Sequence, residues 1–169
     1  MGGTPSAIGT PVYGAQGQGE VGRVEVIEPL SWEGNLVDAA AVAAGNIRVD
    51  PTVRGHPVIS GGPPTLGQEV EKRGASTGRT AGVVSAIELD GVTVSYGTSR
   101  LVFDDQIEID TIEGVFSGQG DSGSAIITVE SDAPPRVIGL LFAGPVWDDG
   151  TPSYANPIAS VFAALGIDG

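Results

Sequence analysis

The sequence predicts an all-β protein whose short strands are followed by a single helix at the C-terminus. The 169 residues include 27 glycines and 12 prolines, a density that favours many strands and turns over long helices. Apolar and polar residues alternate with a period of two in several short runs, as in strands of a barrel or sandwich. Only residues 156–165 place apolar side chains at helical spacing. A chain of this length forms one domain or two small halves.

The first half of the chain contains the weaker strand signals. Residues 1–19 are rich in glycine, proline and glutamine and predict a loop or a loose arm. Short strands are expected at residues 22–28, 36–42, 47–49 and 57–59. The run Gly61-Gly62-Pro63-Pro64 is the best boundary between two halves, residues 1–65 with the Gly-rich arm and residues 66–169 with the terminal helix.

The second half has a more regular strand pattern. Strands are expected at residues 68–72, 83–89, 92–96, 101–103, 106–109, 124–129 and 137–142. Residues 73–82 are rich in Gly, Ser and Thr and predict a turn region, and Asp90-Gly91 predicts a tight hairpin between two strands. Pro157 suits the first turn of the final helix. The apolar face of that helix is expected to dock on the barrel and comprises Ile158, Val161, Phe162 and Leu165.

Composition and charge exclude several classes of function. The net charge is −13 and Lys72 is the only lysine, so a nucleic-acid partner is not expected, and the acidity serves solubility. No apolar run approaches the roughly 18 residues that span a bilayer, so no membrane partner is expected. There is no cysteine and one histidine, His56, so neither a metal site nor a cofactor is predicted. Without a signal peptide at Met1, the localisation is open between the cytoplasm and secretion from a longer precursor.

Residues 118–125 read GQGDSGSA and form the most distinctive stretch of the chain. Glycines allow a sharp turn that leaves Ser122 exposed above backbone N–H groups, which is what acyl transfer needs: a nucleophile beside an oxyanion site. The alternative is an ordinary Gly/Ser hairpin turn. Residues 17–22 and 118–123 both fit the dinucleotide pattern GxGxxG, but each precedes a strand-like run instead of the required helix, so we reject it.

Three other features have a structural and a functional interpretation. Asp38 lies among apolar residues, where it either sits at a strand end, is buried with a partner, or caps a turn after Asn35. His56, between a glycine and a proline, is interpreted as structural or exposed. A group of acids is interpreted as a solvated loop and the polar face of a strand, with a calcium site as the alternative, although no EF-hand spacing is present. These acids are Asp104, Asp105, Glu108 and Asp110.

Three segments together resemble the chymotrypsin-like (trypsin-fold) serine peptidases, in particular the cysteine-free bacterial members. Gly120-Asp121-Ser122-Gly123 resembles the nucleophile motif, residues 35–40 resemble the segment with the triad aspartate, and residues 139–144 resemble the strand along the primary specificity pocket. The resemblance covers residues 20–169. It implies a double β-barrel with an incomplete first barrel, a complete second barrel and a C-terminal helix.

The resemblance also implies roles for individual residues. Ser122 would be the nucleophile, and Asp38 would orient a histidine and stabilise its imidazolium. The backbone N–H groups of Gly120 and Ser122 would form the oxyanion hole. Asp121 would be a structural neighbour that can pair with a processed N-terminus. An apolar substrate pocket would be lined by Phe116, Phe142, Ala143 and Gly144.

One departure from the family pattern limits this assignment. The histidine of the family precedes the aspartate, whereas His56 follows Asp38. We therefore expect an N-terminally truncated serine endopeptidase, with polypeptide substrates, that is inactive alone. Two alternatives stay open: a peptidase-like pseudoenzyme that serves as a binding or scaffold module, and a subunit to which another chain supplies the missing strands and the histidine.

Overall fold

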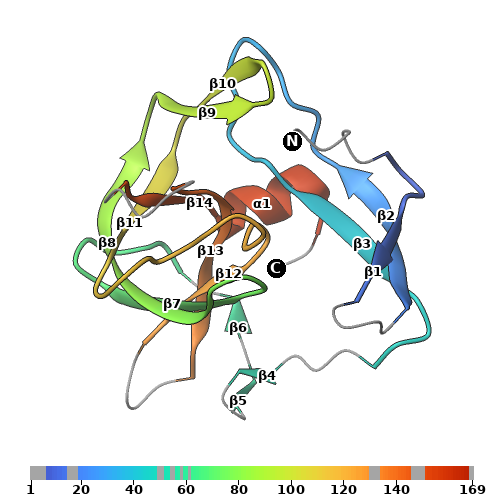
Figure 1. Cartoon of the computed structure of the whole chain (residues 1–169), viewed down its shortest axis with the longest axis horizontal. Helices are drawn as coiled ribbons and strands as arrows, with labels where there is room; N and C mark the ends of the chain where they lie inside the picture. The colour runs from blue at the N-terminus through green and yellow to red at the C-terminus, as the bar shows by residue number, and fades with distance from the viewer. Residues whose placement is uncertain are drawn as a thin grey trace.

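A computed structural model describes residues 7–14, 19–48, 52–53, 56–57, 59–60, 62–129, 134–145 and 151–167. These residues form mainly β-strands, followed by helix α1 (Ile158–Leu165) near the C-terminus (Figure 1). In chain order the strands are β1 (Pro11–Tyr13), β2 (Glu20–Ile27), β3 (Ala40–Ala44), β4 (Thr52–Val53), β5 (His56–Pro57), β6 (Ile59–Ser60), β7 (Glu69–Gly74), β8 (Gly78–Leu89), β9 (Val92–Tyr96), β10 (Ser99–Phe103), β11 (Gln106–Thr111), β12 (Ala125–Thr128), β13 (Arg136–Ala143) and β14 (Ser153–Pro157). In the described parts of the chain, no helix has the length and apolar character needed to cross a bilayer.

The second half of the chain closes into a six-stranded barrel. The strands follow the order β12–β7–β8–β11–β14–β13, and pairing of β12 with β13 completes the ring, while β6 adds to β13 in parallel. Alternation along β11 explains the inward face, because Ile107 and Ile109 are both fully buried while Asp110 is exposed. The core of the barrel comprises Val70, Val84, Ile107, Ile109, Phe116, Ile126, Ile138, Leu141 and Ala155.

The first half forms an open three-stranded sheet instead of a second closed ring. Its order is β1–β2–β3, with both pairings antiparallel. Strands β2 and β3 approach so closely at Gly22 that a Cβ there would lie 2.3 Å from the carbonyl oxygen of Ala43. In Figure 1 the sheet lies to the right of the barrel and α1 lies between the two. The complete barrel, the open sheet and the helix confirm the predicted architecture.

Helix α1 packs between the two halves of the molecule. Its buried face is the one predicted from the sequence, with Ile158, Val161 and Leu165 buried and Phe162 half-buried. These residues share a cluster with Val37 and Ala39, which precede β3. The helix therefore supplies much of the apolar surface on which the N-terminal segment rests.

A separate hairpin, β9–β10, extends from the barrel at the top of Figure 1. The predicted Asp90-Gly91 hairpin is wrong, because β8 pairs with β7 and β11 while β9 pairs with β10. The chain turns a corner there, with Gly91 at a φ of 75°. The loop before β11 holds this corner: Asp104 accepts a hydrogen bond from the Gly91 N–H, and Asp105 donates its N–H to Asp90.

Several other boundaries differ from the predicted ones. The strand predicted at residues 36–42 begins only at Ala40, since residues 36–39 instead cross to α1 and the barrel. Residues 47 and 48 lie outside any strand, and residue 49 lies outside the described residues. The arm before residue 20 contains β1, which pairs with β2 and is therefore not wholly loose. The predicted turn region of residues 73–82 shortens to residues 75–77 because β7 and β8 pair up to Gly74 and Gly78. The division into halves at residue 65 stays a prediction.

Candidate active site

The turn that carries Ser122 leads directly into β12 and has a tightly determined backbone. Asp121 donates its N–H to the Gly118 carbonyl at 3.0 Å, and Gly123 donates its N–H to the Leu141 carbonyl of β13 at 2.8 Å. Gly120 adopts a φ of 100° and Gly123 a φ of 88°, in the left-handed region that favours glycine. A Cβ on Gly120 would also lie 2.7 Å from the Ser76 hydroxyl oxygen. The sequence GDSG is therefore suited to this turn for steric reasons.

Ser122 is exposed on the outer side of this turn. Its hydroxyl donates a hydrogen bond to the carbonyl oxygen of Phe142 at an Oγ–O distance of 3.3 Å. Within the described residues, the backbone N–H groups of Gly120 and Ser122 have no hydrogen-bond partner. Two backbone donors near an exposed hydroxyl are thus without partners, and an oxyanion site requires backbone donors of this kind.

Asp121 anchors the turn from below. Its side chain is buried and its carboxylate accepts five hydrogen bonds, from the N–H groups of Ser76, Thr77 and Gly118, the Thr77 hydroxyl and the Lys72 ammonium. Burial alone would raise the pKa of Asp121. The hydrogen bonds from Thr77, Lys72 and the backbone outweigh burial and hold the pKa well below its usual range. The carboxylate is therefore ionised at neutral pH.

Lys72 supplies the positive charge beneath the turn. Its ammonium lies 3.0 Å from the Asp121 carboxylate, and both side chains are 0% exposed. It also donates to the Gly78 carbonyl and lies 5.9 Å above the ring of Phe116. The expectation that Asp121 can pair with a processed N-terminus is thereby corrected, because the lysine fills that place. Sequence reasoning missed this role, although Lys72 alternates with Val70 on the inward face of β7.

The Asp121 network predicts an acid-sensitive fold. The pKa of Asp121 is lower in the folded chain than its ordinary value of 3.8. As the pH falls toward 3.8 and below, Asp121 is therefore protonated in the unfolded state before it is protonated in the folded state. Its contribution to stability is fully present above about pH 5 and is lost as the pH falls through the lowered pKa. We expect urea midpoints to drop between pH 5 and pH 3, about the range in which unfolded-state carboxyls titrate. Asp121→Asn should be less stable at pH 7, but its urea midpoint should fall less between about pH 5 and pH 3 than that of the parent chain. Urea midpoints that fall in parallel for the two proteins would contradict this account.

Asp38 has its own set of partners in the segment before β3. It is half-buried, its carboxylate accepts a hydrogen bond from the Tyr96 hydroxyl, and its N–H donates to the Asn156 side chain at 3.1 Å. Asn156 in turn donates to Gln106 at 2.7 Å. Of the three interpretations from the sequence, burial with a partner describes Asp38 best. Burial, then the hydrogen bond to Asp38 and its charge, raises the pKa of Tyr96 far above its usual value, so Tyr96 stays a donor.

Aromatic contacts connect the surroundings of Asp38 with those of Ser122. The Tyr96 and Phe103 rings have centroids 6.2 Å apart, and the Phe103 and Phe142 rings have centroids 4.8 Å apart. The backbone carbonyl of Phe142 is the acceptor for the Ser122 hydroxyl. Asp38 and Ser122 are thus connected through the rings of Tyr96, Phe103 and Phe142 and the backbone carbonyl of Phe142. The sequence did not identify Tyr96, although it alternates with Val92 and Val94 along a regular strand.

The residues expected to line an apolar pocket do not share one environment. Phe116 lies in the barrel core, whereas Phe142 belongs to a second cluster with Val92, Leu101 and Phe103 and has half-buried Ala143 beside it. Gly144 is exposed, and a Cβ there would lie 2.2 Å from the Ser117 hydroxyl oxygen. Ser117 is hydrogen-bonded to Ser153 at 2.7 Å. The space beside Gly144 is therefore bounded by hydroxyls, and the pocket assignment stays a prediction.

The remaining candidates from the sequence have other surroundings. His56 lies in the short strand β5, and its side chain is outside the described residues. Glu108 accepts a hydrogen bond from the Ser85 hydroxyl, and Asp104 is committed to the corner at Gly91. In the described part of the chain, no three Asp, Glu, His or Cys side chains gather in a way that could hold a metal ion.

Comparison with known proteins gives similarity in structure alone. No family model matches the chain, and no curated protein matches it. Among solved structures, a Nocardiopsis protease (NAPase) is similar with a TM-score of 0.65 and 19% sequence identity, over 95% of this chain and 78% of that one. A glutamic acid specific serine protease that uses a histidine triad in substrate binding has a TM-score of 0.62 and 21% identity, over 90% and 75% of the two chains. A Cellulomonas bogoriensis chymotrypsin has a TM-score of 0.58 and 19% identity, over 86% and 73%.

These similarities establish the fold. The chain has the chymotrypsin-like fold of bacterial serine proteases, as the resemblance in the sequence implied. At identities near one fifth, the fold alone does not determine which residues act or on what. The chemistry of the turn at Ser122 has to be argued from its own geometry.

Proposed function

We propose that, on this chymotrypsin-like fold, Ser122 is the nucleophile of a serine-endopeptidase site whose substrates are polypeptides. The observation that carries the proposal is the turn at residues 118–123, where an exposed hydroxyl lies beside two backbone N–H groups without partners in the described residues. A buried, charge-compensated aspartate fixes that turn from below. Pre-organised donors of this kind are what stabilise developing negative charge in acyl transfer.

The proposed reaction assigns each group one step. The Ser122 hydroxyl oxygen attacks the carbonyl carbon of a peptide bond while its proton passes to a base, and the N–H groups of Gly120 and Ser122 hold the oxyanion. The amine leaves with that proton, and water then releases the acyl group in the same manner. Each oxyanion donor contributes about 3 kcal/mol in sites of this kind. Asp38 would orient the base without itself taking the proton.

The base is the missing component of the proposed site. The only histidine, His56, follows Asp38 in the sequence, and the Asp38 carboxylate accepts the Tyr96 hydroxyl. A serine hydroxyl without a base is a weak nucleophile at neutral pH. We therefore propose that these 169 residues by themselves hydrolyse peptides very slowly, and that a histidine supplied by a further segment or another chain would complete the site.

Labelling with a fluorophosphonate probe tests the nucleophile directly. We expect slow modification of Ser122 in the full chain, about 10⁶-fold slower than with a complete triad, because that is roughly the cost of removing a triad histidine. Added imidazole should accelerate the labelling by acting as a surrogate base. Ser122→Ala should remove labelling and keep the thermal midpoint nearly unchanged, since the side chain is exposed. His56→Ala should label like the parent chain.

The same experiment contains the results that would reject the proposal. A folded sample that stays unlabelled at Ser122 with imidazole present would exclude the nucleophile. A large loss of labelling in His56→Ala would instead identify His56 as the base. Peptide mapping of the labelled chain distinguishes modification of Ser122 from modification elsewhere.

A second candidate function is a peptidase-like binding module without catalysis. Two contacts favour it: the Asp38 carboxylate is engaged by Tyr96, and the Ser122 hydroxyl is engaged by the Phe142 carbonyl. Such a module would bind an unfolded casein equally well before and after Ser122→Ala, and imidazole would not stimulate labelling. Stimulated labelling of Ser122 would favour the peptidase.

A further inference from the structure

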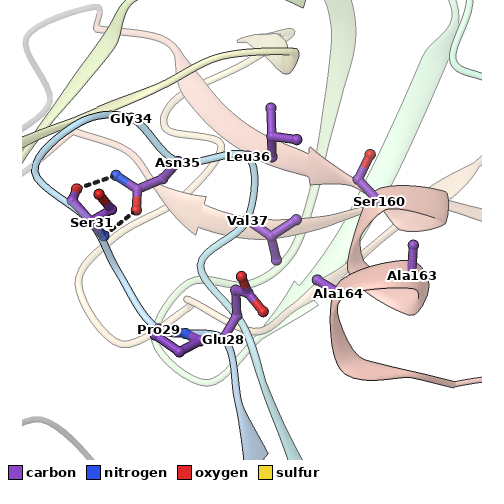
Figure 2. A pocket seen from close by; sticks show the side chains of 10 residues that line it. All are labelled: Glu28, Pro29, Ser31, Gly34, Asn35, Leu36, Val37, Ser160, Ala163 and Ala164. Carbon is purple, nitrogen blue, oxygen red and sulfur yellow. Dashed lines mark hydrogen bonds between the residues drawn. The ribbon is translucent and has the colours of Figure 1, made fainter.

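An open groove lies between helix α1 and the segment that joins β2 to β3, in the described part of the chain. Its volume is about 500 Å³. Figure 2 shows the residues around it, with the loop of residues 28–37 on one side and the helix on the other. The walls are mainly apolar and are formed by Pro29, Leu36, Val37, Ala163 and Ala164. None of the residues assigned to the Ser122 site lines it, so any ligand of this groove lies outside that site.

Glu28 is the single acidic residue that lines the groove. Figure 2 shows its carboxylate between Val37 and Ala164. The side chain is partly buried, and among the described residues its carboxylate has no ion pair and no hydrogen bond. A partly desolvated carboxylate between apolar walls gains more from a cationic partner than one in water does.

The loop side of the groove is held in place by hydrogen bonds. Ser31 and Asn35 bind each other twice, through the Ser31 N–H at 2.7 Å and the Ser31 carbonyl at 2.8 Å (Figure 2). Asn35 also donates to the Val102 carbonyl of β10, and Val37 is buried against α1. The groove is therefore largely formed before any ligand arrives, which lowers the entropic cost of binding.

We propose that this groove is a docking site for a lysine or arginine side chain of an extended polypeptide. The apolar stem of that side chain would lie on Leu36 and Ala163, and its charged end would meet Glu28. Long cationic side chains combine these two characters, an apolar stem and a polar end. This inference goes beyond the proposed reaction at Ser122, because it concerns a separate surface and requires no chemistry.

The surroundings of the groove favour this occupant over others. The net charge of −13 attracts basic segments and repels acidic ones. A wholly apolar occupant would leave Glu28 buried without a partner, which is costly. One carboxylate is too few for a calcium ion, which takes six to eight oxygen ligands. In the same loop as Glu28, Trp32 is 74% exposed and Leu30 is also exposed, so the residues flanking the cation are expected to be apolar.

Binding of short peptides to the full chain tests the proposal. The probe is fluorescein-labelled Gly-Leu-Arg-Leu-Gly amide, measured by fluorescence anisotropy, with the same peptide carrying citrulline in place of arginine as its neutral equivalent. We expect the arginine peptide to bind at least about tenfold more tightly than the citrulline peptide, as for a charge-assisted pair. Glu28→Gln should remove most of that preference. Ala163→Phe, at an exposed helix position that faces the groove, should block both peptides.

A matched variant separates the groove from general acidity. Glu25 lies on β2, three residues before Glu28, and is exposed, so Glu25→Gln changes the net charge equally and should alter affinity by less than about twofold. Equal weakening by the two substitutions would overturn the proposal, as would equal binding of the arginine and citrulline peptides or no binding of either. Ser122→Ala should bind the arginine peptide like the parent chain, so this result and the labelling result can fail independently.

Discussion

Replacing Lys72 with methionine is expected to destabilise the fold by about 3–5 kcal/mol, because the substitution leaves the Asp121 charge buried without its partner. Both side chains of the pair are 0% exposed and their charged atoms are 3.0 Å apart. The loss would be concentrated beneath the Ser122 turn, since Asp121 is part of that turn. Urea unfolding at pH 7 measures the free energy, and imidazole-stimulated labelling of Ser122 should fall as well.

A second ion pair in the same hairpin gives the control. Arg79 lies 2.6 Å from Glu71, and its side chain is 64% exposed while that of Glu71 is 5% exposed. Because one member of this pair is solvated, Arg79→Met should cost less than Lys72→Met, in which both members are buried. The double variant Lys72→Met/Asp121→Asn should be more stable than Lys72→Met alone, because no uncompensated charge remains. A Lys72→Met protein within 1 kcal/mol of the parent would show that the pair does not hold the turn.

Replacing Phe103 with alanine is the second substitution with a large expected effect. Its side chain is 0% exposed and lies between the rings of Tyr96 and Phe142. Removing a ring of this kind typically costs about 3–5 kcal/mol, from lost transfer energy and the cavity that remains. Because Tyr96 binds Asp38 and the Phe142 carbonyl binds the Ser122 hydroxyl, both sides of the proposed site should loosen together.

Thermal and urea unfolding of Phe103→Ala, with fluorophosphonate labelling at the same temperature, would measure both effects. Val102→Ala is the neighbouring control, since Val102 is 38% exposed and should lose less than about 1 kcal/mol. If Phe103→Ala lost stability but labelled Ser122 at the parental rate, the aromatic contacts would be structural only and would not support the site.

Patterns within a short stretch of sequence were sufficient to predict a strand or a helix wherever the residues of that stretch alone determine it. The strand at residues 92–96 has the predicted boundaries, because its alternation is regular and Gly91 and Gly97 bound it. The apolar face of α1 was likewise visible from spacing alone. The prediction of a hairpin at Asp90-Gly91 was wrong because a turn sequence indicates that the chain changes direction but does not indicate which strand the next segment pairs with. That choice depends on β7 and β11, which are distant in the sequence.

The candidate site could be predicted only in part, because some of its contacts also depend on residues that are distant in the sequence. The turn of residues 118–123 is encoded by three glycines within six consecutive residues, so the sequence is sufficient to predict it. The partners of its neighbours come from far along the chain: Lys72 for Asp121, and Tyr96 and Asn156 for Asp38. No local pattern specifies such pairs. An inward-facing charge or hydroxyl on a regular strand, as at Lys72 and Tyr96, is the signal that was available.

The packing of α1 has a consequence for the order in which the chain acquires its structure. Val37 and Ala39 are buried against Ile158, Val161 and Leu165, so the N-terminal sheet rests on a helix that is synthesised more than 100 residues later. We expect strands β1 to β3 to stay exposed during synthesis and to become protected from hydrogen exchange only after α1 has emerged. Contacts between the two ends of a chain also slow folding. A nascent form of this protein therefore presents unpaired strands for longer than its size alone would suggest.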